Sequence, residues 1–174
     1  TSTVEVQLTT DEALINRAEA KIRVGDLAGG LADLNVWTQA YLRPGLAKRT
    51  FTQAEIKAYY DALPYADKTT RSPKKHLTKA HFKLHDGSTI TEGTATEALL
   101  QYVLQCRRIL TLHEGLRWQD IKRFGIDIYR WKKVDAGADT YEVPADGVLL
   151  GSDLRHAIAL PQQAITGQIQ QNPR

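Results

Sequence analysis

Residues 96–125 read TEALLQYVLQCRRILTLHEGLRWQDIKRFG, and this stretch decides the fold because it joins a long apolar stripe to a dense cluster of charges. The apolar residues of its first part recur at three- and four-residue steps: Leu99, Leu100, Val103, Leu104, Leu110 and Leu112. This spacing predicts a largely buried helix. Thr94 and Glu97 have the spacing of a capping box, in which the two side chains cover free N–H groups at a helix start.

Gly115 interrupts this helical pattern. Residues 116–124 then predict a second, shorter helix with Trp118, Ile121 and Phe124 on one face. Gly125 follows at the position where a helix commonly ends in a left-handed residue. The stretch therefore predicts two helices that meet at a glycine break.

Charged residues crowd around this break: Arg107, Arg108, Glu114, Arg117, Asp120, Lys122 and Arg123. Charges beside a buried stripe are costly unless they are paired, so we expect an Arg–carboxylate network that pins the two helices together. On this hypothesis, Arg117→Ala breaks a buried ion pair and destabilises the protein by about 3–5 kcal/mol. An active site built from the same residues is the alternative.

The run CRRILTLHEGLRWQDIKRFG, residues 106–125, resembles the signature of the SusD/RagB family. The matching positions are Arg107, Arg108, Glu114, Gly115, Arg117, Trp118, Asp120, Lys122 and Arg123. A second run, ALINRAEAKIRVGDLAGGLADLN at residues 13–35, is similar to the penultimate helix pair of these proteins. Near the end, Pro161-Gln162 and Gln171-Asn172-Pro173 also resemble the family, whereas residues 50–90 match more loosely.

Proteins of this family are surface-exposed outer-membrane lipoproteins of Bacteroidetes-type bacteria. They capture oligosaccharides or peptides and pass them to a TonB-dependent (SusC-like) transporter. The resemblance implies a non-enzymatic nutrient-binding protein of which this chain is the C-terminal portion, with the lipidated Cys of the anchor upstream of the sequence. In the family, glycan contacts come largely from upstream loops, so the resemblance assigns no ligand-binding residue here.

Length and composition agree with one globular domain over residues 1–174, because 42% of the residues are hydrophobic and 25% are charged. The chain contains no Met, which we interpret as the mark of a fragment or a processed product. The lone Cys106 lies within the apolar stripe and is expected to be a small buried hydrophobe. The net charge of +3 permits acidic partners without requiring them.

The rest of the chain completes a mainly α prediction. Helices are expected from Thr9 to Ile22, from Leu27 to Tyr41 and from Thr52 to Leu63, with capping-box spacing at Thr9–Glu12 and Thr52–Glu55. The first two resemble a tetratricopeptide helix pair, with Gly29 and Gly30 explained by close helix packing. Thr1–Leu8 is expected to be extended, and residues 68–86 irregular. Alternation over residues 126–131 and a return at 140–143 predict a small β-hairpin.

No catalytic constellation, metal site or cofactor is expected. His113-Glu114 lacks the second histidine of a zinc-protease helix, since position 117 is Arg. Three loop histidines lack a completing ligand: His76, His81 and His85. Aromatic residues could stack on sugar rings, although packing is the competing interpretation; they are Tyr59, Tyr60, Tyr65, Tyr129, Trp131 and Tyr141.

The basic loop 68–83 supports an alternative function, a helical-repeat adaptor that binds a protein or nucleic acid. Polybasic runs are weak patterns, and this loop has few aromatic residues for base stacking. A solvated loop is therefore the preferred interpretation, with no nucleic acid among the expected partners.

Overall fold

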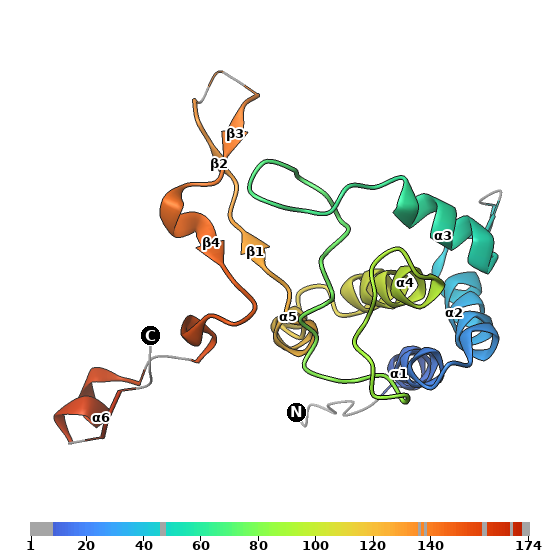
Figure 1. Cartoon of the computed structure of the whole chain (residues 1–174), viewed down its shortest axis with the longest axis horizontal. Coiled ribbons are helices and arrows are strands. Elements are labelled where there is room, and N and C mark those ends of the chain that lie inside the picture. The colour runs from blue at the N-terminus through green and yellow to red at the C-terminus, as the bar shows by residue number, and fades with distance from the viewer. Residues whose placement is uncertain are drawn as a thin grey trace, which may run out of the picture.

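The computed structural model describes residues 9–45, 48–135, 137, 139–157, 160–167 and 169–171. The protein is mainly helical, as predicted, and a helical body is followed by short strands that lead away from it (Figure 1). The helices of the body are α1 (Thr10–Arg23), α2 (Leu27–Tyr41), α3 (Gln53–Asp61), α4 (Ala95–Leu110) and α5 (Arg117–Phe124). The predicted extended segment Thr1–Leu8, and Asn172 and Pro173 of the C-terminal match, lie outside the described residues.

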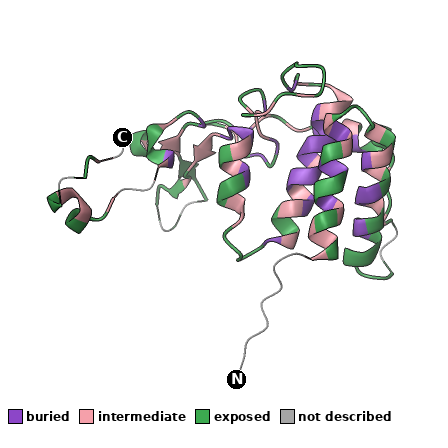
Figure 2. Cartoon of the chain, turned by 90° about the horizontal axis from the view of Figure 1, so that it is seen from below, coloured by how far each residue is buried: buried purple, intermediate pink, exposed green. Residues whose placement is uncertain are grey.

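Helix α4 is the centre of the body, with α1, α2 and α3 packed around it and α5 at its end (Figure 1). Its inward residues Leu99, Leu100 and Val103 are fully buried, and Figure 2 shows buried residues concentrated on the facing sides of these helices. The predicted stripe is thus confirmed, except at Leu112. That residue is 64% exposed because α4 ends at Leu110.

The predicted helix starts are confirmed, but only one is a complete capping box. At α3, the side chains of Thr52 and Glu55 both accept backbone N–H groups of the first turn. At α4, Thr94 accepts the Glu97 N–H at 3.2 Å, whereas the Glu97 carboxylate accepts the N–H of Gly93 at 2.7 Å. The Glu97 side chain is buried, where it also meets partners from other segments.

Helices α1 and α2 pack closely, as the small residues predict. A Cβ atom on Gly30 would lie 2.5 Å from Cγ1 of Ile22 and 2.9 Å from the carbonyl oxygen of Ala18. At Gly29 the neighbour is different, since a Cβ there would meet the side chain of Asp26, which caps α2. Packing between the helices therefore explains Gly30 but not Gly29.

Gly30→Ala is expected to destabilise the protein by about 1–3 kcal/mol, because the added methyl overpacks the α1–α2 contact. Urea unfolding followed by circular dichroism measures this change. The control is Ala32→Gly at an exposed position of α2, which is expected to cost about 1 kcal/mol through helix propensity alone. If Gly30→Ala stabilised the protein, as helix propensity alone favours, the close packing would be refuted.

The strands differ from the predicted hairpin in their pairing. Strand β1 (Ile128–Tyr129) pairs with β4 (Val148–Leu149), and β2 (Lys132–Lys133) pairs with β3 (Tyr141–Glu142), both antiparallel. The predicted return strand at residues 140–143 is therefore confirmed as β3. Its partner is β2, which follows the predicted first strand at residues 126–131. Residues 126–131 do not form one strand, since only Ile128 and Tyr129 are paired as strand residues; the N–H of Arg130 continues this pairing with a bond to the carbonyl of Gly147.

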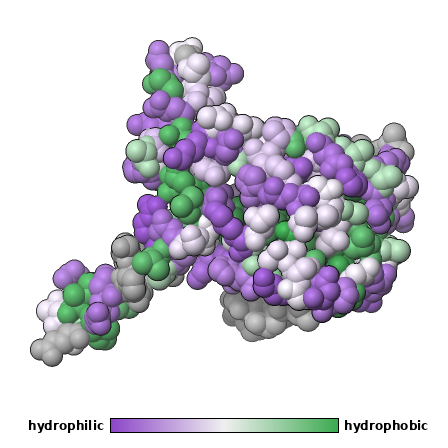
Figure 3. All heavy atoms as spheres, in the orientation of Figure 1, coloured by the Kyte–Doolittle hydropathy of each residue, from purple (hydrophilic) through white to green (hydrophobic). Residues whose placement is uncertain are grey.

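The C-terminal part includes two short 3₁₀ helices, Ala145–Gly147 and Leu154–His156, and helix α6 (Gln162–Thr166). It projects from the helical body as an arm in the space-filling view (Figure 3). Among the described helices, none is long and apolar enough to span a lipid bilayer.

Candidate functional site

An ion-pair network joins α4 to α5, as predicted. Nε of Arg107 in α4 donates to both carboxylate oxygens of Asp120 in α5, at 3.0 and 3.1 Å. Nη2 of Arg123 donates to the same carboxylate at 3.1 Å. The Asp120 side chain is only 1% exposed, so two guanidinium groups compensate one buried charge.

The network also reaches α1, which the sequence reasoning missed. Arg123 donates to both carboxylate oxygens of Glu19, at 2.6 and 2.8 Å, and Arg107 donates to the side chain of Asn16. Glu19 lies on the buried side of α1 beside Ile15 and is 3% exposed. The sequence contains a signal for Glu19, because a charged residue on the apolar face of a predicted helix needs a partner.

Four other charges of the predicted cluster do not join the network. Arg108, Glu114 and Lys122 are exposed. Arg117 is half-buried, and its Nη1 atom is buried without a hydrogen-bond partner in the described chain. The predicted ion pair of Arg117 was therefore wrong, because Asp120 is already bonded to Arg107 and Arg123.

The remaining signature residues shape the junction. Gly115 has a left-handed φ of 77° and ends the turn between the helices, as its position predicted. The Trp118 ring stacks on His156 at 5.0 Å, and that histidine is bonded to the carbonyl of Leu150 at 2.9 Å. Trp118 therefore holds the C-terminal segment against α5.

Arg117→Met is expected to change the free energy of unfolding by less than about 1 kcal/mol, in either direction. The substitution keeps an unbranched apolar stem and removes a partly buried charge that has no ion-pair partner among the described residues. Chemical unfolding of the two proteins measures the change. A loss of 3 kcal/mol or more would show that Arg117 belongs to the stabilising network after all.

A cavity of about 420 Å³ lies beside this network. Its wall is formed by the loop at residues 66–75, by α4 and α5, and by residues 126–131. Four cationic side chains line it: Arg71, Lys75, Arg108 and Arg117. We call this cavity the cationic pocket.

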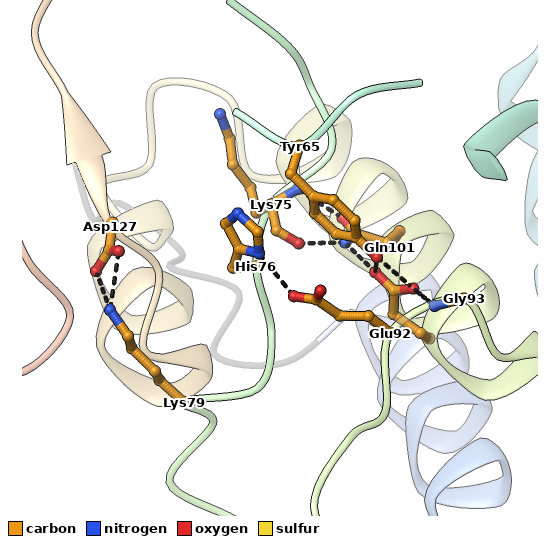
Figure 4. A network of polar contacts seen from close by, with 9 residues as sticks. Tyr65, Lys75, His76, Lys79, Glu92, Gly93, Gln101 and Asp127 are labelled. Atoms are coloured by element: carbon orange, nitrogen blue, oxygen red, sulfur yellow. Dashed lines mark hydrogen bonds and ion pairs between the residues drawn. The ribbon is translucent and has the colours of Figure 1, made fainter. Parts of the chain in front are cut away.

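Helix α4 positions Lys75 of the cationic pocket. The side-chain amide of Gln101 accepts the Lys75 N–H at 3.2 Å and donates to the Lys75 carbonyl at 2.5 Å. The same amide donates to Glu97 at 3.1 Å, and Glu97 also accepts the Tyr65 hydroxyl at 3.0 Å (Figure 4). The Lys75 ammonium donates to the carbonyl of Ser72 within the loop at 2.8 Å, and the two Gln101 bonds hold the loop against α4.

The basic loop 68–83 is irregular, as predicted, but it is not simply solvated. Lys74 is 4% exposed, and its ammonium lies 4.1 Å from the centre of the Tyr65 ring. The ring of Tyr65 also stacks on His76 at 4.4 Å, and Lys79 binds Asp127 at 2.9 Å (Figure 4). These contacts leave fewer free cations for phosphate groups than the sequence indicated, which counts against the adaptor hypothesis.

Positive charge is in excess in the cationic pocket. Burial lowers the pKa of Lys75, and the neighbouring charges of Arg117 and Arg108 lower it further. Burial likewise lowers the pKa of Arg117, with Asp120 opposing the shift and Arg108 adding to it. Asp127 is the one carboxylate among the described residues of the lining, and it already binds Lys79 and the N–H of Gly151.

The aromatic candidates fall in different places. Tyr129 and Trp131 line the cationic pocket. Tyr59 and Tyr60 line a second cavity of about 550 Å³, which shares Pro73 and Arg108 with the first. Of the other two, Tyr65 is held in the network below the loop, and Tyr141 lies under the guanidinium of Arg71 at 5.3 Å.

Two other reactive side chains, those of His76 and Cys106, are bonded or buried. Nδ1 of His76 lies 2.6 Å from the Glu92 carboxylate, and the described residues contain no group of three His, Cys, Asp or Glu placed to hold a metal ion. Cys106 is 1% exposed, and burial raises the pKa of its thiol to about 12, which confirms the expected buried hydrophobe.

The arrangement is suited to binding an anion next to a ring, because guanidinium groups are strong charge-assisted donors and aromatic side chains supply flat apolar surface. Comparisons of the chain with protein-family models, with curated proteins and with solved structures gave no match.

Proposed function

We propose that this chain is the C-terminal helical portion of a SusD/RagB-like lipoprotein. Its function is non-enzymatic binding of a nutrient, a glycan or a peptide, at the cell surface. The observation that carries the proposal is an open pocket with aromatic and hydrogen-bonding groups, which lies beside helices held together by buried ion pairs. Concave sites with apolar walls and a few fixed polar groups are the usual form of small-ligand sites.

The signature contains residues that hold the helices together and residues that line the pocket, and this combination supports the proposal. Arg107, Asp120 and Arg123 hold α1, α4 and α5 together, whereas Arg108 and Arg117 face the cationic pocket. Such a scaffold keeps the helices that carry the binding groups in fixed positions, which lowers the entropy cost of binding. The resemblance of residues 106–125 to the family signature supplies the biological setting.

In that setting the protein is anchored in the outer membrane by a lipidated Cys outside residues 1–174 and is exposed at the cell surface. Its partner is a TonB-dependent, SusC-like transporter, to which it delivers the bound nutrient. The resemblance to the family supports both the anchor and the transporter partner.

Calorimetric titration of the chain with neutral oligosaccharides, acidic oligosaccharides, short peptides and duplex DNA tests the proposed function. Saturable binding of a sugar or a peptide, without DNA binding, is the expected result. Tight DNA binding that weakens steeply with salt, with no response to sugars or peptides, would instead support the adaptor hypothesis. Co-purification with an outer-membrane transporter from the native membrane tests the delivery step separately.

A further inference from the structure

We propose that the cationic pocket binds the carboxylate of an acidic sugar, a hexuronate residue of an oligosaccharide, through Arg117 and Arg108. Tyr129 and Trp131 provide the wall against which the sugar ring lies. This inference rests on the proposed nutrient-binding function and names the class of ligand.

The first support is the unsatisfied charge of Arg117. Its Nη1 is buried, and Asp120, the carboxylate that acts on it electrostatically, is bonded to Arg107 and Arg123. Nη1 of Arg117 therefore has a hydrogen-bond donor without an acceptor, and an anion that entered the pocket would supply one.

The second support is that the other cations of the pocket also have no carboxylate partner, although Arg71 and Arg108 are exposed. Arg71, Lys75 and Arg108 form no ion pair with a carboxylate in the described parts of the chain; Arg71 contacts the Tyr141 ring, and Lys75 donates to a backbone carbonyl. Arg117 also begins α5, where the helix dipole adds positive potential. Three separate segments thus bring positive charge to one cavity.

The third support concerns the rest of the ligand. A cavity of about 420 Å³ is larger than a lone carboxylate needs and falls within the usual range of small-molecule sites. The other walls of the pocket are partly apolar, since Tyr129 and Trp131 line it together with Ile121, Ile126 and Ile128. A ring that carries a carboxylate matches both halves of this lining.

Calorimetric titration of the full chain with a trigalacturonate tests the inference, with the fully methyl-esterified trimer as the neutral analogue. The variants are Arg117→Met and Arg108→Gln; Arg108 is exposed, so its replacement leaves the fold intact. Lys122→Met is the matched control, because it removes one positive charge from an exposed position of the same helix. A tripeptide with a free C-terminal carboxylate provides the same anion from a different source.

We expect the uronate to bind, the methyl ester to bind at least about ten-fold more weakly, and each arginine variant to lose about ten-fold or more in affinity. Lys122→Met should bind like the unmodified chain. Equal binding of the acid and the ester, or unchanged binding by both arginine variants, would overturn the inference.

The other outcomes separate the two proposals. Binding of neutral oligosaccharides alone would overturn the uronate assignment while keeping the nutrient-binding function. Binding of the tripeptide but not the uronate would overturn it in the same way. Uronate binding by a protein that does not associate with a transporter would keep the assignment and refute the delivery function.

Discussion

Asp120→Ala is expected to lower the free energy of unfolding by about 3–5 kcal/mol, because it removes the shared partner of two guanidinium groups. The carboxylate is 1% exposed, and the side chains of Arg107 and Arg123 are 13% and 36% exposed. Without Asp120, Arg107 loses two hydrogen bonds and keeps a bond to Asn16 only. Two positive charges would then lie close together without their common counter-charge.

Chemical unfolding of the two proteins, followed by circular dichroism, measures this effect. The matched control is Asp61→Ala, which removes a carboxylate from an exposed pair with Lys57 on α3. Exposed pairs of this kind contribute less than about 1 kcal/mol. Equal losses for Asp120 and Asp61 would show that the α4–α5 network does not stabilise the fold.

Gly125→Ala is the second substitution with a large expected effect, a loss of about 3–5 kcal/mol. Gly125 ends α5 at a left-handed φ of 62°, where side chains are disfavoured. An added Cβ would also lie 2.3 Å from the carbonyl oxygen of Lys79, a backbone atom that cannot move aside easily. The loop at Lys79 would have to shift, and with it the hydrogen bond from the His81 N–H to the Arg123 carbonyl.

Gly87→Ala separates the two causes. Gly87 has a φ of 79° but no atom within 4 Å of an added Cβ, so its replacement should cost only the left-handed penalty of about 1–2 kcal/mol. Thermal and urea unfolding of both variants give the comparison. Similar losses at the two positions would mean that the close approach of Lys79 has no energetic weight.

Much of the helical fold was predictable from the sequence because local signals determine it. The apolar stripe of α4, the Thr residues that start α1, α3 and α4, and the glycine after Phe124 all lie within a few residues of the feature they specify. The strand pairing was less predictable. Segments of two residues carry little periodicity, so the alternation over residues 126–131 indicated a strand without identifying β4 as its partner.

The site was predictable only in part, for a related reason. Charge crowding around Gly115 correctly indicated a network, but the carboxylate of Asp120 can hold only some of the available arginines. Which arginines it holds depends on the positions of α1 and of Glu19, and these follow from the tertiary packing. The cationic pocket likewise depends on tertiary packing. Lys75 lines the same cavity as Arg117 because its loop is bonded to Gln101, a residue far from it in the chain.

Binding of an acidic sugar in the cationic pocket requires that the positive charge of Arg117 be available to a ligand. The most direct test is a heteronuclear NMR titration that follows the arginine Nε–H groups while trigalacturonate is added. We expect a saturable shift of the Arg117 signal with the uronate, a shift that needs at least about ten-fold more of the methyl ester, and an unchanged signal for Arg155, which is paired with Asp153. An Arg117 signal that stays fixed while the uronate binds, or that moves no more than the Arg155 signal, would refute binding of the uronate through Arg117.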